Sequence, residues 1–201
     1  MLIWLVLIPL IAAALIGLCK APARPTALLS ASLTLALGIW ALVSFDGCSS
    51  CWSRFEGMDL QLTLAPALSK VMLLLTILVT FATVLGTNPP QGGEASWYNS
   101  ALLISAGATG AFLSDNIISF FAFHELALIP TFVMIGLYGR GDRRTTAWRA
   151  TLYLGLASMV LLAALLMIGT QAGFTFSGLK DFMASGRELA HAELIGALLI
   201  A

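Results

Sequence analysis

A succession of apolar runs, each close to 20 residues long, is the feature that most constrains how this chain folds. An α-helix rises about 1.5 Å per residue, so about 20 apolar residues cross the roughly 30 Å hydrocarbon core of a bilayer. We expect helices over residues 2–18, 26–45, 64–87, 97–113, 114–138 and 150–170, and a seventh that begins near His191. The sequence therefore predicts an all-α polytopic membrane protein, a bundle of six transmembrane helices plus the start of a seventh.

Composition supports the membrane assignment. Of the 201 residues, 59% are hydrophobic and 10% are charged, whereas a soluble domain carries about 25% charged residues. The formal net charge of zero gives no indication of nucleic-acid binding. The first apolar run has no basic segment before it and is predicted to be a retained helix. The last run, 194–201, carries no cap or charge that would end a helix, so the chain is expected to be the front part of something longer.

Basic residues predict the orientation in the membrane. The connections after the first and fifth helices together carry Lys20, Arg24, Arg140, Arg143, Arg144 and Arg149. The opposite side carries Arg54, Lys180 and Arg187. Because basic residues concentrate in cytoplasmic loops, the first set is expected on the cytoplasmic (or matrix or stromal) side and the N-terminus outside.

Glu125 is the residue in the fifth run that needs a special explanation. It lies near the centre of residues 114–138, at about the bilayer midplane, where an ionisable group costs about 2.5–3.5 kcal/mol. No basic residue shares its helix face, so a counter-charge must come from another helix or another subunit. Burial favours the neutral carboxyl and a nearby lysine favours the carboxylate, which is what a proton relay needs. The alternative is a carboxyl that only holds helices together.

Other residues of the fifth run allow two interpretations each. Pro130 frees the carbonyl of Leu126, which creates either a kink and water site beside the acid or a simple packing kink. His124 points about 100° away from Glu125 and is either a second relay group or, the preferred interpretation, a packing histidine with a satisfied ring. Asp115 and Asn116 are expected as N-caps of the helix.

Three further features lie outside the fifth run. Lys70 lies in the first two turns of the third helix, where it either snorkels to the interface, as preferred, or joins a charged chain across the membrane. Cys48 and Cys51 would close a local disulfide in an oxidising compartment. Small residues at four-residue spacing over 105–111 permit close helix packing.

The segment 110–140 carries a family resemblance. Its Glu-Leu-Ala-Leu-Ile-Pro stretch at 125–130, flanked by aromatic residues, resembles the antiporter-like proton-translocating subunits of respiratory complex I, NADH:quinone oxidoreductase. Subunit M, called chain 4 in mitochondria, is the most similar member. Residues 147–163 resemble the sixth helix of the same family. Two departures are His124, where the family has an aromatic or apolar residue, and Pro66–Ser69 with Lys70, where the family has Asp-Gly-Leu-Ser.

The resemblance implies a fold, a role and partners. Glu125 matches the helix 5 glutamate that pairs, in the family, with a helix 7 lysine beyond this chain. Residues 1–96 would form helices 1–3, and 97–201 a truncated first half-channel of a fold with about fourteen helices. The chain would be a proton-translocating membrane-arm subunit that couples quinone reduction to pumping. FMN, iron–sulfur clusters and quinone are expected elsewhere in the enzyme, and no cofactor or redox centre in this chain.

Partners and location follow from the same resemblance. Other membrane-arm subunits and the lipid bilayer are the expected partners, with no nucleic acid and no soluble small-molecule ligand. The bacterial plasma membrane is the expected location, and an organellar inner or thylakoid membrane the alternative. Other functions that stay open are a stand-alone Mrp-type cation/proton antiporter, a membrane-bound hydrogenase or photosynthetic complex I-like subunit, and a truncated structural remnant.

Overall fold

A computed structural model describes residues 2–44, 49–55, 58–64, 67–89, 92–185, 189 and 191–200. The helices within these ranges are α1 Leu2–Cys19, α2 Ala23–Ser44, α3 Ala67–Gly86, α4 Glu94–Leu113, α5 Ile117–Tyr138, α6 Arg143–Ala172, α7 Phe176–Ala184 and α8 Ala192–Ile200. Two strands, β1 Ser49–Phe55 and β2 Met58–Thr63, pair antiparallel. The predicted all-α membrane fold is confirmed, with this one hairpin as an addition.

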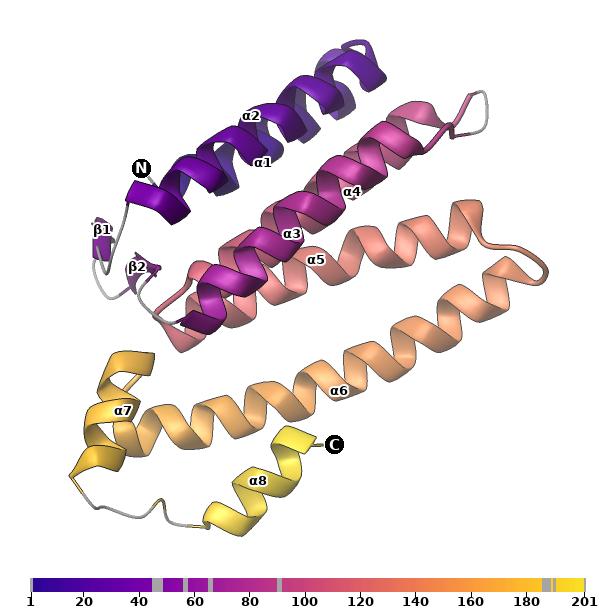
Figure 1. Ribbon diagram of the computed structural model, residues 1–201. Coiled ribbons are helices and arrows are strands. Elements are labelled where there is room, and N and C mark those ends of the chain that lie inside the picture. Colours follow the sequence, from indigo (N-terminus) through magenta and orange to yellow (C-terminus); the bar gives the residue numbers. More distant parts are fainter. Residues whose placement is uncertain are drawn as a thin grey trace.

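The six long helices lie side by side and alternate in direction (Figure 1). The α1–α2, α3–α4 and α5–α6 connections gather at one end of the bundle, and the strands and α7 lie at the other. The two basic connections, which contain Lys20 and Arg140, therefore share one end, as the orientation prediction requires. Which side of a membrane that end faces stays a prediction.

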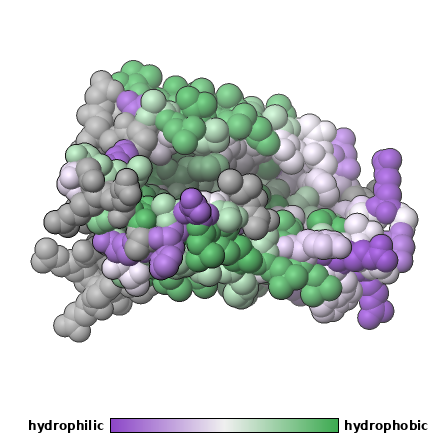
Figure 2. Space-filling view, turned by 90° about the horizontal axis from the view of Figure 1, so that it is seen from below, coloured by the Kyte–Doolittle hydropathy of each residue, from purple (hydrophilic) through white to green (hydrophobic). Residues whose placement is uncertain are grey.

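On the face seen in Figure 2, apolar side chains cover much of the length of the bundle, and hydrophilic ones lie toward both of its ends, including the end that holds the α5–α6 connection. Five helices, α1, α2, α3, α5 and α6, are long and apolar enough to cross a membrane. Helix α4 has the same 20-residue length as α3, but is less apolar and buries hydroxyl side chains such as Ser100, Ser105 and Thr109. Its position between α3 and α5 keeps that polar surface inside the bundle.

The segment before α3 differs from the predicted helix 64–87. Residues 58–63 form β2 and α3 begins at Ala67. The reason is packing: Leu62 and Leu64 are buried in one apolar cluster with Leu2, Leu5 and Leu113. Extended chain can place alternate leucines against this cluster. Cys48 lies outside the described residues, so its predicted disulfide with Cys51 stays a prediction.

Helix α6 is longer than the predicted 150–170, because it begins at Arg143. Asp142 caps it: its Oδ1 accepts a hydrogen bond from the backbone N–H of Thr145 at 3.3 Å. The hydrogen bonds from Thr145 lower the pKa of Asp142 below its ordinary value. An apolar pattern marks only the membrane-embedded part of a helix, whereas a cap starts the helix earlier, in the polar arginine-rich segment.

The start of α5 is tied to the end of α6. Asn116 caps α5, since its Oδ1 accepts a hydrogen bond from the N–H of Ile118 at 2.8 Å. The N–H of Ile117 donates to the carbonyl of Phe174 at 2.9 Å, and the N–H of Phe176 donates to the carbonyl of Asp115 at 2.7 Å. The N-cap prediction is confirmed for Asn116. The short helix α7, which apolar run length did not predict, begins directly after this bridge.

Candidate functional site: a carboxyl group at mid-span

Glu125 of α5 and Ser158 of α6 meet near the middle of both helices. Ser158 Oγ donates a hydrogen bond to Glu125 Oε1 at 2.5 Å. Ser158 is 2% exposed, whereas the side chain of Glu125 is 37% exposed. The hydroxyl is therefore fixed in the interior, and the carboxyl reaches from it toward the surface of the bundle. A hydroxyl donor stabilises a carboxylate without adding a charge.

Close packing of α4 against α5 holds the backbone around Glu125. A Cβ atom on Gly107 would stand 2.8 Å from the carbonyl oxygen of Phe123 and 2.9 Å from the backbone nitrogen of Ala127. A Cβ atom on Gly110 would stand 2.4 Å from the ring of Phe123. Only glycine permits this approach. The small residues predicted to allow close helix packing thus do so on the turn of α5 that carries Glu125.

His124 lies beside the same carboxyl oxygen. Its Nδ1 is 3.8 Å from Glu125 Oε1, too far for a hydrogen bond. Nδ1 is buried and has no hydrogen-bond partner among the described residues. The imidazole stacks near the rings of Phe120 and Phe121, with centroids 6.3 and 6.4 Å away. The ring thus lies against aromatic side chains, but the expectation of a satisfied ring is not met at Nδ1 among the described residues.

Two adjacent cavities flank the Glu125–Ser158 contact. The first, about 180 Å³, lies between α5 and α6 and is lined by Glu125, Leu128, Ile129, Phe132, Ile135, Ala150, Thr151, Leu154 and Gly155. The second, about 200 Å³, also touches α8 and is lined by His124, Leu128, Leu154, Ala157, Ser158, Leu161, Leu198 and Leu199. Because Leu128 and Leu154 line both, the two cavities are neighbours. Glu125 borders the first, and its two polar neighbours border the second.

Pro130 is buried within α5, which continues past it to Tyr138. The next residue, Thr131, donates a hydrogen bond from Oγ1 to the carbonyl of Ala127 at 2.8 Å. This hydrogen bond lies in the part of α5 that follows Glu125. The predicted water site at the carbonyl of Leu126 stays a prediction. Pro130 lines neither of the two cavities.

Lys70 stands apart from Glu125. It lies in the first turn of α3, at the end of the bundle that holds the strands, and is half-buried. It lines neither cavity beside Glu125. The structure thus brings His124 to Glu125, but not Lys70. In the described part of the chain, no group of three or more histidine, cysteine, aspartate or glutamate side chains is placed to hold a metal ion.

Sequence reasoning missed Ser158. A serine in the apolar run 150–170 is one of several small polar residues in the spanning helices, and nothing in its neighbours along the chain marks it. The sequence feature that could have pointed to Ser158 is its position near the middle of its apolar run, at about the same depth in the membrane as Glu125. Its role becomes visible only when α6 is placed against α5.

Residues 114–201 match the family described as "NADH:quinone oxidoreductase/Mrp antiporter, TM". The matched stretch contains Glu125, His124 and Ser158, so the site lies inside it. The fold and the match define the class: an integral membrane protein with the antiporter-like arrangement of helices.

Particular relatives are named subunit M, as the resemblance predicted. F(420)H(2) dehydrogenase subunit M of Methanosarcina mazei is 25% identical over 168 residues, which cover 79% of this chain and 34% of that protein. NADH-quinone oxidoreductase subunit M of Rickettsia typhi is 27% identical over 150 residues, 71% of this chain and 28% of that protein. This chain thus spans about a third of the length of the curated relatives it matches. The predicted resemblance to subunit M, or chain 4, is confirmed.

The fold also matches that of one chain in a solved complex. A chain of respiratory complex I from Thermus thermophilus with bound NADH superposes with a TM-score of 0.82 at 25% identity, over 100% of this chain and 43% of that one. The helical bundle therefore follows an arrangement found in a multi-subunit membrane complex.

Proposed function

We propose that this chain is part of a proton-translocating membrane-arm subunit of a respiratory NADH:quinone oxidoreductase, in which Glu125 takes up and releases the transported proton. The observation that carries the proposal is the placement of Glu125. Its carboxyl lies at mid-span, borders a cavity and has a neutral hydroxyl as its hydrogen-bond donor. A carboxyl that borders a cavity at mid-span can exchange a proton with a neighbouring group or with water that enters the cavity.

The rest of the proposal rests on the family resemblance of the sequence and on its pattern of basic residues. Electron transfer would take place in other subunits, which would hold FMN, iron–sulfur clusters and quinone, and this chain would carry no redox cofactor. Its partners would be other membrane-arm subunits and lipid, in a bacterial plasma membrane with the N-terminus outside. Because one relative is a subunit of an F(420)H(2) dehydrogenase, the electron donor depends on subunits other than this one.

Glu125→Gln in the assembled complex tests the proposal. Glutamine keeps the size and still accepts a hydrogen bond from Ser158, but carries no transferable proton. We expect proton pumping in sealed vesicles and the coupled quinone reduction to fall sharply while the complex still assembles. Glu94→Gln is the matched control, since Glu94 is an exposed carboxylate in the first turn of α4, outside the apolar spans. Normal pumping by Glu125→Gln would remove Glu125 from the proton path, and loss of assembly would favour a role in helix packing.

A stand-alone Mrp-type cation/proton antiporter is the second candidate, because the matched family description includes both kinds of protein. The two differ in what accompanies the chain. Copurification with flavin and iron–sulfur proteins supports the oxidoreductase. Sodium/proton exchange by vesicles without an electron donor, in a complex that lacks redox centres, supports the antiporter.

A further inference from the structure

Ser158 and His124 compete for the same oxygen atom of Glu125. Ser158 Oγ donates to Glu125 Oε1 at 2.5 Å, and His124 Nδ1 stands 3.8 Å from that atom. A hydrogen bond between nitrogen and oxygen needs about 2.7–3.2 Å. A shift of about 1 Å in the carboxyl, well within a side-chain rotamer change, would therefore exchange the serine contact for a histidine contact.

We propose that Ser158 is a positioning residue that holds Glu125 away from His124, and that His124 exchanges a proton with Glu125 when this hydrogen bond opens. The inference rests on the proposed function of Glu125 and adds its immediate proton partner. In the forward step the O–H bond of the protonated carboxyl breaks and an N–H bond forms at His124 Nδ1. The products are a carboxylate and an imidazolium, and the reverse step restores the neutral pair.

The two cavities define the path of this exchange. Glu125 borders the cavity between α5 and α6, whereas His124 and Ser158 border the cavity beside α8. Leu128 and Leu154 form the shared wall. A proton that moves from Glu125 to His124 thus passes from one cavity to the next. Ser158 connects the two cavities, since it lines the second and its hydroxyl donates to the carboxyl of Glu125, which lines the first.

The described residues around His124 are apolar or carry a hydroxyl, with Glu125 as the exception. Helix α6 presents Ala157, Ser158 and Leu161 to the cavity, and α8 presents Leu198 and Leu199. On α5 itself, Phe120 and Phe121 stack near the ring. Helix α4 meets this turn of α5 through Gly107 and Gly110. His124 and Glu125 are therefore the pair of side chains whose proton exchange the variants below test.

Four variants of the assembled complex test the inference, with pumping measured between about pH 6 and 8, where an ordinary histidine titrates. Because Ser158→Ala removes the donor that holds Glu125 away from His124, we expect the carboxyl to stay in contact with the histidine and pumping to fall by about tenfold, the factor to which the loss of a hydrogen bond to a charged group corresponds. Ser158→Thr keeps a hydroxyl donor at this position and is expected to retain pumping. We expect His124→Phe and His124→Gln to lower pumping similarly and to flatten its pH profile. Phenylalanine retains the stacking on the aromatic neighbours, and glutamine tests the same loss with a polar side chain. Ser30→Ala is the matched control, because Ser30 is a buried serine of α2 whose hydroxyl has no hydrogen-bond partner among the described residues.

A double variant separates the two roles. If Ser158 acts by holding Glu125 away from His124, then Ser158→Ala adds no further loss in a His124→Phe background. Wild-type pumping and an unchanged pH profile in both histidine variants would overturn the inference. So would failure of threonine to rescue, or full additivity of the double variant. Normal pumping by Glu125→Gln would instead overturn the proposed function. If Glu125→Gln loses pumping and the histidine variants do not, this inference alone is overturned.

Discussion

Gly107 of α4 lies directly against Phe123 of α5, so close that an added Cβ atom would stand 2.8 Å from the carbonyl oxygen of Phe123. This approach fixes α5 two residues before Glu125, while the hydrogen bond from Ser158 fixes the carboxyl from the side of α6. The candidate site is thus held from two helices, one through backbone packing and one through a side chain. Each contact can be removed separately.

Gly107→Ala is expected to destabilise the bundle by about 1–3 kcal/mol, the usual cost of overpacking a close contact. The new methyl group would meet backbone atoms of α5, which cannot move aside without moving Glu125. The measurement is the midpoint of thermal unfolding of the purified protein, together with pumping. Gly86→Ala is the control, since a Cβ atom on Gly86 of α3 meets no atom within 4 Å and Gly86 lines neither cavity beside Glu125. Equal stability of the two variants would contradict the packing argument.

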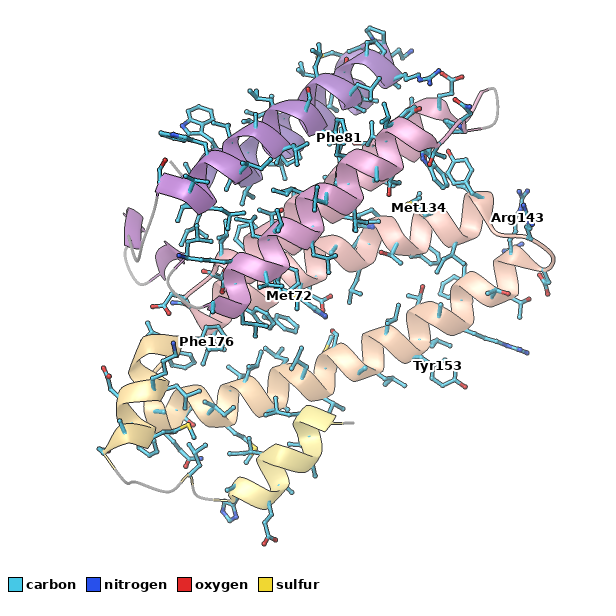
Figure 3. The ribbon with its side chains drawn as sticks, viewed as in Figure 1. Met72, Phe81, Met134, Arg143, Tyr153 and Phe176 are labelled. Carbon is cyan, nitrogen blue, oxygen red and sulfur yellow. The ribbon has the colours of Figure 1, made fainter. Side chains whose placement is uncertain are left out.

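Tyr138→Phe tests the end of α5 that lies near the arginine-rich connection. The hydroxyl of Tyr138 donates to the carbonyl of Gly93, and its ring packs edge-on against Trp97 at 5.0 Å. Phenylalanine keeps the ring contact and loses the hydrogen bond, so we expect a loss of about 0.5–1.5 kcal/mol in the free energy of unfolding. Tyr153→Phe should leave stability unchanged, because Tyr153 is 74% exposed on the side of α6 away from α5 (Figure 3). A cost for Tyr153→Phe as large as that for Tyr138→Phe would refute this prediction.

Asn116→Ala is expected to fray the first turn of α5. The alanine cannot accept the hydrogen bond that Asn116 accepts from the N–H of Ile118, and an N-cap of this kind is worth about 1 kcal/mol. Asn116→Ser keeps a capping oxygen and should retain most of the stability. Faster amide hydrogen exchange at residues 117–120 in the alanine variant alone would support the prediction. Equal exchange in all three proteins would show that the bridge to Phe174 and Phe176 holds the turn without the cap.

Asp142 makes the start of α6 sensitive to acid. Its pKa in the folded protein is lowered by the hydrogen bonds from Thr145, so Asp142 stabilises the helix above its ordinary pKa. This stabilisation is lost as the pH falls through the lowered pKa. We expect Asp142→Ala to speed hydrogen exchange at the Thr145 amide at neutral pH, and the difference from the wild type to disappear in acid. Asp142→Asn, which caps without titrating, should show little dependence on pH over this range. A difference between wild type and Asp142→Ala that persists in strong acid would contradict the assignment.

Connections were harder to predict than the long helices. Run length located all six long helices, because each must bury a stretch of apolar residues as long as the bilayer is thick. The strands at 49–63 and the short helix Phe176–Ala184 were not predicted, because neither contains an apolar run of spanning length. The strands form where Leu62 and Leu64 find a cluster built from α1 and α4. The segment before α7 is fixed by backbone hydrogen bonds to residues 115–117. Both depend on partners that are distant along the chain.

The sequence by itself determined that this protein lies in a membrane, where its long helices fall and that Glu125 is placed at mid-span. It did so because the cost of an ionisable group among apolar residues is a local property of one helix. Only the tertiary structure decided that Ser158, 33 residues away, donates to that carboxyl and that His124 Nδ1 stands 3.8 Å from the same oxygen. Hydrogen bonds between helices depend on which faces meet, and the approach of α4 at Gly107 and of α6 at Ser158 sets those faces here.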